Sequence, residues 1–176
     1  GSEMCIRDRT HIAQPPYAIF CKGAMPDARK SVGIVGARMC SEYGRSIATK
    51  LGKLLADKDV QVISGMALGI DSASHAGALQ GKGSTFAVLG CGCDVCYPKN
   101  ARNLYENIQS SGGGILSEYP PGTEPMPYRF PERNRIISAL SDCLVVVEAK
   151  KKSGSLITAD FALEQGKDVW LSLIHI

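Results

Sequence analysis

The sequence predicts an α/β fold of the doubly wound, Rossmann-like type, in which a mostly parallel sheet lies between two layers of helices (three-layer αβα). Short apolar runs of strand length alternate with longer segments that have helical periodicity. The apolar runs are continuous, as expected for parallel strands that are covered on both faces. A length of 176 residues fits one such domain.

Each element follows from its local pattern. We expect strands at 32–35, 60–63, 86–89, 115–116, 144–147 and 169–170, and helices at 45–55, 71–79, 101–110, 132–140 and 156–165. The first helix shows apolar residues at Ile47, Leu51 and Leu54, and glycine follows several of the strands. The proline-rich segment 119–131 is expected to be a loop, and 17–20 an added edge strand.

The composition indicates a globular chain, with 44% hydrophobic and 21% charged residues. The net charge of +3 is only mildly basic, so attraction to phosphate depends on where Lys and Arg lie. The seven cysteines are odd in number, and the sequence shows neither a secretory leader nor an apolar run that could span a bilayer. We therefore expect a cytoplasmic protein with reduced thiols and no membrane association.

Both ends of the chain look foreign to the domain. Residues 171–176 can be encoded by a DNA segment whose reverse complement also matches the other end of the chain. When that reverse complement is read from its second base, it encodes residues 4–8. One segment in inverted orientation at both ends indicates a sequencing-library adapter translated with the gene. We expect 1–11 and 171–176 to be such tails and 12–170 to be the core, truncated at its C-terminal end. Native codons at both ends of the source locus would contradict this.

The candidate site lies in the loops that follow the strands, because ligands bind doubly wound sheets at the carboxyl ends of the strands. The first loop is Gly36-Ala37-Arg38. Glycine and a helix start let backbone amides approach an anion, and Arg38 can clamp a phosphate oxygen. Taken alone, the loop is explained equally well by a tight turn at Gly36 and a solvated Arg38.

The second loop contains Ser64 and Gly65 and leads into another helix. Asp71 is expected to cap that helix. His75 is expected to be a packed helix residue, because no acid or nucleophile at a diagnostic spacing marks a triad.

The third loop carries the cysteines at 91, 93 and 96 and then Lys99, Asn100 and Arg102, which open a helix and suit contact with an anion. A structural zinc site needs a fourth ligand from a second knuckle, and none has the right pattern. We therefore interpret the cysteines as small buried thiols and expect neither a metal nor a cofactor.

The last two loops continue the pattern. Phe130, Arg133 and Arg135 follow the proline-rich segment, and only one of two arginines spaced two apart is expected to face a ligand. Phe130 or Tyr97 is expected to stack on a base. Small hydroxyl residues and open amides then form an anion nest at Ser153, Gly154, Ser155 and Thr158.

Several common nucleotide motifs are missing. The first turn is not G-x-G-x-x-G, no acidic residue ends the second strand, and neither G-x-x-x-x-G-K-[ST] nor H-E-x-x-H occurs. This disfavours a dinucleotide-dependent oxidoreductase and an ATPase.

Taken in order, the loops resemble those of one family. The motifs that carry the resemblance are Ile34-Val-Gly-Ala-Arg38, Ser64-Gly-Met-Ala-Leu-Gly-Ile-Asp71, Phe130-Pro-Glu-Arg-Asn-Arg-Ile-Ile137 and Ser153-Gly-Ser-Leu-Ile-Thr158. From about residue 15 to residue 170, the sequence is similar to the core of DNA processing protein A, also called the Smf family.

The resemblance implies an extended Rossmann fold that binds single-stranded DNA without sequence preference. It implies a role in natural transformation, where family members protect incoming DNA and load the recombinase RecA, and a homodimer in the full-length protein. It makes Arg38 the leading DNA contact, followed by Lys99, Asn100, Arg102, Arg133 and Arg135, with 153–158 completing the pocket. Ala37 replaces the family's commoner serine, and the family core continues beyond Trp170.

We therefore expect a DNA-binding domain without catalytic residues. The main alternative is a nucleoside-monophosphate phosphoribohydrolase of the lysine-decarboxylase-like (LOG) type, with Glu118 or Glu148 as acid and Arg38 on the phosphate. The Pro-Gly-Gly-x-Gly-Thr loop of those enzymes is missing from the sequence. A third reading is a small-nucleotide sensor without turnover.

Overall fold

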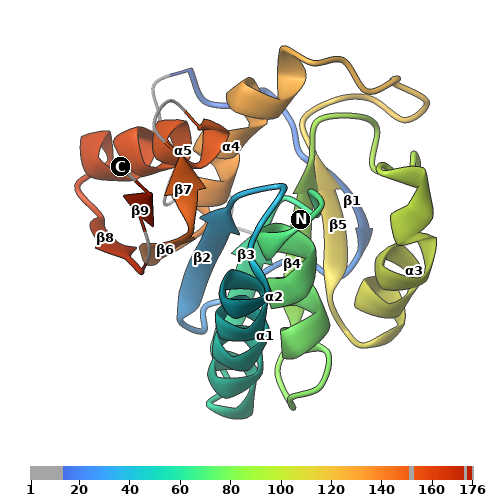
Figure 1. Cartoon of the computed structure of the whole chain (residues 1–176). Helices are drawn as coiled ribbons and strands as arrows, with labels where there is room; N and C mark the ends of the chain where they lie inside the picture. Colours follow the sequence, from blue (N-terminus) through green and yellow to red (C-terminus); the bar gives the residue numbers. More distant parts are fainter. Residues whose placement is uncertain (1–13, 151–152, 173, 176) are drawn as a thin grey trace.

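The computed structural model describes residues 14–150, 153–172 and 174–175. Its main sheet has seven strands in the order β1-β5-β4-β3-β2-β6-β8. The strands are β1 (Phe20–Gly23), β2 (Ser31–Gly36), β3 (Gln61–Ser64), β4 (Thr85–Leu89), β5 (Gly114–Ser117), β6 (Cys143–Val147) and β8 (Asp168–Leu171). The pairs between β5 and β8 in this order are parallel, and β1 is antiparallel to β5, so the expected fold class is confirmed (Figure 1).

Helices cover both faces of the sheet. The helices are α1 (Glu42–Asp57), α2 (Ile70–Ala78), α3 (Arg102–Ser110), α4 (Arg129–Ala139) and α5 (Gly154–Glu164). Successive residues of a strand pack into different cores: Ile34 joins a cluster with residues of α1 and α2, whereas Val35 joins one with residues of α4 and α5. Because both faces of the sheet are buried, every position of such a strand must be apolar, which explains the continuous apolar runs in the sequence.

Glycine allows the two helices α1 and α2 to pack closely. A methyl group on Gly77 would lie 2.0 Å from the carbonyl oxygen of Thr49, and one on Gly52 would lie 2.2 Å from that of Ser74. Any larger residue at either position would push the helices apart.

Several boundaries differ from the sequence-based expectation. The edge strand lies at 20–23 rather than 17–20, and α4 begins at Arg129, so that Pro131 occupies its first turn, where a missing N–H costs no hydrogen bond. Helix α1 begins at Glu42 because the Ser41 side chain accepts from the Gly44 amide. A short pair, β7 (Ala149–Lys150) with β9 (Ile174–His175), was not expected.

The expected tails are only partly covered by the structure. Residues 1–11 lie outside the described residues, and Leu171 extends β8 by pairing with Val146. Their adapter origin stays a prediction. Within the described ranges, no helix is both long and apolar enough to cross a membrane.

The strand order places the candidate site. Strand β2 has β3 on one side and β6 on the other, and the chain visits β3, β4 and β5 before it returns to β6. This reversal is the topological switch point, where doubly wound sheets form a crevice at the carboxyl ends of the strands. Gly36 of β2 lies opposite Val147 of β6 at that end.

Candidate functional site

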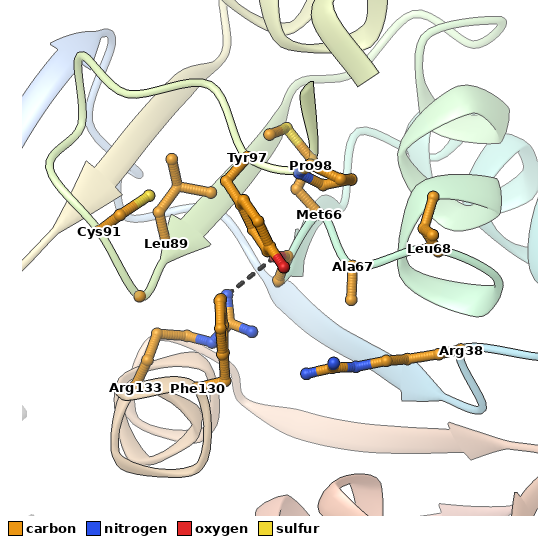
Figure 2. Close-up of a pocket in the computed structure, with 12 residues that line it drawn as sticks. Arg38, Met66, Ala67, Leu68, Leu89, Cys91, Tyr97, Pro98, Phe130 and Arg133 are labelled. Carbon is orange, nitrogen blue, oxygen red and sulfur yellow. Dashed lines mark hydrogen bonds between the residues drawn. The ribbon is translucent and has the colours of Figure 1, made fainter. Parts of the chain in front are cut away.

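A cleft of about 390 Å³ lies at the switch point. The sequence-predicted residues that line it are Gly36, Ala37, Arg38, Phe130, Arg133, Ser153, Gly154, Ser155 and Thr158. A smaller pocket of about 60 Å³ lies beside it and shares Arg38, Ala67, Phe130 and Arg133 with the cleft (Figure 2). The fold therefore brings together loops that are more than a hundred residues apart in the sequence.

Arg38 is the exposed cation of this cleft. Its guanidinium carbon lies 5.4 Å from the centroid of the Phe130 ring, and Figure 2 shows the side chain extended toward that ring. Among the described residues, no carboxylate forms an ion pair with it. An exposed arginine that rests on an aromatic face keeps its donors available for an anion.

The backbone amides of the first two loops are used within the protein. The Ala37 amide donates to the Glu148 carbonyl at 2.9 Å, and the Gly65 amide donates to the Asp71 carboxylate at 3.2 Å. The expectation that these amides are open to an anion is therefore wrong. A methyl group on Gly36 would lie 2.0 Å from the Val147 carbonyl oxygen, so this glycine permits close packing of β2 against β6.

Asp71 and Arg133 form the charged floor of the cleft. Both are buried, at 6% and 3% exposure. Burial raises the pKa of Asp71 to about 6, while the charge of Arg133 and the amides of Ala67, Gly65 and Gly36 oppose the rise. Burial likewise lowers the pKa of Arg133 to about 10. Asp71 is the second residue of α2, after the N-cap Gly69, so the expectation that it caps the helix is wrong.

The two arginines of α4 have different environments. Arg133 donates through Nη1 to the carbonyls of Gly65, at 2.8 Å, and of Val88, so it ties α4 to the ends of β3 and β4. Arg135 lines neither the cleft nor the adjoining pocket and forms a bidentate pair with Glu118 at 2.7 and 2.6 Å. Only Arg133 therefore lines the cleft, as expected for one of two arginines spaced two apart, whereas Arg135, an expected DNA contact from the family resemblance, lies outside it.

The start of α5 forms the opposite wall. The hydroxyls of Ser153 and Ser155 lie 2.8 Å apart, and Thr158 donates to the Gly154 carbonyl at 3.2 Å. Asn134 donates to the same carbonyl at 3.1 Å and thereby joins α4 to α5. Helix starts carry partial positive charge, so this wall favours an anion.

Phe130 is packed by its neighbours. Its ring stacks on Tyr97 with 5.3 Å between centroids, and the guanidinium carbon of Arg133 lies 5.9 Å from its centroid. Together with Arg38, these contacts cover part of the Phe130 ring, which is half-buried.

Six expected site residues lie outside the cleft: Ser64, Gly65, Lys99, Asn100, Arg102 and Arg135. Of these, Gly65 lines the adjoining pocket. Ser64 is fully buried, and its hydroxyl donates to the Ile34 carbonyl at 2.5 Å. Lys99 and Asn100 are exposed on the short 3₁₀ helix η3 (Lys99–Ala101) and line neither the cleft nor the adjoining pocket. Arg102 pairs with Glu106 at 3.1 Å and lines a separate pocket with Lys22.

Two polar residues of the cleft were not among the expected site residues. Asn134 lies between the two arginines of α4. Its position between two expected site residues was the sequence signal that could have indicated it. Asp71 was expected only to cap α2. An aspartate at a helix start has the same local sequence pattern whether its carboxylate caps the helix or, as here, accepts from the amide of another loop.

The packing roles expected for His75 and the cysteines agree with the structure. His75 is fully buried, and burial lowers its pKa to about 3. Its Nδ1 lies 2.7 Å from the Thr85 hydroxyl, which itself donates to the Val62 carbonyl, so Nδ1 carries the proton. Cys91 and Cys93 are buried in an apolar cluster with Met66, whereas Cys96 is only half-buried against that cluster.

The carboxylates of the enzymatic alternative are committed elsewhere. Glu118 is paired with Arg135. Glu148 has a left-handed backbone, with φ of 55°, and its carboxylate accepts from the Ser41 amide at 2.9 Å and from the Ser41 hydroxyl at 2.8 Å. Neither glutamate lines the cleft.

The family model described as DNA recombination-mediator protein A matches residues 7–175. The chain belongs to this family. It is 43% identical to DNA processing protein DprA of Streptococcus pneumoniae over 165 residues, which cover 93% of this chain and 57% of that protein. It is 41% identical to protein Smf of Escherichia coli over 156 residues, covering 88% of this chain and 42% of that protein. The chain thus spans about half the length of the curated relatives it matches.

Solved structures of DNA processing protein A have the same fold. The Streptococcus pneumoniae protein matches with a TM-score of 0.86 and 40% identity over 97% of this chain and 61% of that one. The Helicobacter pylori protein, described for its single-stranded DNA binding mode, matches with a TM-score of 0.81 and 30% identity over 94% of this chain and 76% of that one. A molybdenum cofactor binding protein of Rippkaea orientalis, at 20% identity and a TM-score of 0.61, shares the fold alone.

Proposed function

We propose that this recombination-mediator domain binds the phosphate backbone of single-stranded DNA, without sequence preference, in the cleft at the switch point. The observation that carries the proposal is Arg38, an exposed guanidinium that has no ion-pair partner within the described residues and faces the hydroxyl-lined start of α5. A phosphate between these two walls receives a charge-assisted hydrogen bond from Arg38 and favourable charge from the helix start.

The contacts divide into three groups. Arg38, Ser153 and Ser155 are proposed to bind phosphate directly. Arg133 supports the site by holding the loops of β3 and β4, because its Nη1 already donates to two carbonyls. Lys99 and Asn100 are proposed to contact the strand only outside the cleft, where both are exposed.

The wider role rests on the relatives. We propose that the full-length protein acts in the cytoplasm as a homodimer in DNA uptake and loads RecA onto single strands. The family description as a recombination mediator supports this role, as does the DNA binding described for the Helicobacter pylori relative. No residue of the cleft is assigned a catalytic role.

Binding of labelled oligonucleotides, measured by fluorescence anisotropy, tests the proposal. Single strands of unrelated sequence should bind with similar affinity and more tightly than duplex, and log K should fall against log salt by about 0.7 per phosphate neutralised. Arg38→Ala should weaken binding about tenfold or more to every sequence, since hydrogen bonds to charged groups contribute about 1.5–3 kcal/mol.

Lys50→Ala, which removes an exposed charge from α1, is the matched control and should leave binding nearly unchanged. Equal binding by Arg38→Ala and the parent chain would refute the assignment of the cleft. Release of free base from AMP or CMP by the purified chain would favour the phosphoribohydrolase instead. A melting shift with mononucleotides, without turnover and without strand binding, would favour the sensor.

A further inference from the structure

A cluster of Tyr119, Tyr128 and Arg129 lies at the start of α4, just outside the cleft. Tyr128 is the residue before the helix, and the cleft is lined by Pro127, which precedes it, and by Phe130, two residues after it. The guanidinium carbon of Arg129 lies 4.9 Å from the Tyr119 ring centroid and 5.5 Å from that of Tyr128. Two aromatic rings and a cation therefore lie next to residues that line the cleft.

Hydrogen bonds hold this cluster in place. Arg129 donates through Nη1 to the Glu124 carbonyl, and its backbone amide donates to Met126 at 3.0 Å. The Tyr119 hydroxyl donates to Glu132 at 3.1 Å. A platform that is already ordered loses little conformational freedom when a ligand binds.

Tyr128 is more exposed to solvent than Phe130. Its exposure is 55%, whereas Phe130 is packed by Tyr97, Arg38 and Arg133. Among the described residues, Arg129 forms no ion pair, so its charge remains available to a phosphate that passes the rings. An exposed aromatic ring beside an unpaired cation is the combination that single-strand binding proteins use for bases of any sequence.

We propose that Tyr128, supported by Arg129 and Tyr119, is a base-stacking platform that receives a nucleobase of the single strand outside the cleft. The proposal rests on the proposed function, because it extends the path of the same strand. The platform contributes binding energy through the π-face of the base, whereas Arg38 contributes it through the phosphate. The platform adds affinity for strands that are long enough to reach it, and it tolerates every base.

Anisotropy with two oligothymidines, of about 4 and about 16 nucleotides, tests the platform in the full chain. Tyr128→Ala should weaken binding of the longer strand about fivefold or more, since stacking contributes about 1–3 kcal/mol per base, and should leave the shorter strand nearly unaffected. Tyr128→Phe should retain the affinity of the parent chain, and Tyr128→Leu should lose it. Tyr43→Ala, at an exposed tyrosine of α1 outside the cleft, is the matched control.

A strand of abasic sites provides a readout that a merely structural role would not move. It keeps the phosphates and lacks the bases, so Tyr128→Ala should bind it as the parent chain does. Equal loss of abasic and ordinary strands, or unchanged binding of the long strand by Tyr128→Ala, would overturn the platform. If the parent chain binds strands in an Arg38-dependent manner while Tyr128→Ala changes nothing, only this inference fails. If the parent chain binds no strand, the proposed function itself fails.

Discussion

Asp71→Asn should change how the stability of the domain depends on pH. The carboxyl of Asp71 is buried and has a pKa of about 6 in the folded chain, against an ordinary value of 3.8. The folded state therefore binds this proton more tightly than the unfolded state. The resulting stabilisation is fully present below pH 3.8 and is lost as the pH rises through about 6, with a total of about 3 kcal/mol.

His75 acts in the opposite direction over an overlapping range. Its pKa falls from 6.5 to about 3 on folding, so the neutral imidazole stabilises the fold at higher pH, and this contribution is lost as the pH falls from 6.5 toward 3. The stability of the parent chain alone would therefore hide the titration of Asp71. The difference in unfolding free energy between the variant and the parent chain isolates it.

Urea unfolding, followed by circular dichroism at several pH values from about 4 to about 7.5, measures that difference. The stability of Asp71→Asn relative to the parent chain should rise by about 3 kcal/mol from the acidic to the neutral end, because asparagine cannot ionise. Asp160→Asn, at an exposed carboxylate of α5, controls for the lost charge. A constant difference for Asp71→Asn over the whole range would refute the reasoning.

Three further outcomes are expected. Affinity for single strands should fall as the pH rises through about 6, because ionised Asp71 repels phosphate in the cleft. Anisotropy measured across this pH range should show a weaker pH dependence of affinity for Asp71→Asn. Gly36→Ala should lower the free energy of unfolding by more than about 2 kcal/mol, since its methyl group would meet Val147 and Ile70, and a thermal midpoint equal to that of the parent chain would contradict this. Arg135→Ala should lower the free energy of unfolding, measured in urea titrations, by about 2 kcal/mol or more, because Glu118 is left unpaired. The same variant should keep its affinity for single strands, and a loss as large as that of Arg38→Ala would show that Arg135 contacts the DNA.

The fold could be predicted from the sequence because its signals are local. Continuous apolar runs such as 144–147 and the helical spacing of Ile47, Leu51 and Leu54 do not depend on distant residues. The position of the cleft followed from the same pattern, since parallel strands bring their carboxyl ends to one edge. Arg38 and the Ser153 turn were found in this way.

What the sequence could not predict is which groups have partners far away in the chain. The amide of Ala37 is taken by Glu148, and the guanidinium of Arg135 by Glu118. Both pairings join segments that no local pattern relates. A loop rich in glycine and arginine therefore predicts the edge at which an anion binds more reliably than it predicts which of its donors are available.

Glu148 gives the two walls of the cleft a common anchor. Its carbonyl holds the Ala37 amide, and its carboxylate holds Ser41 on the other side of Arg38. The segment that presents Arg38 is thus fastened at both ends to a single residue at the root of the opposite wall. Any rearrangement of the backbone after β6 should therefore be transmitted to Arg38. The spacing of the two walls is thus set by one residue that does not itself line the cleft.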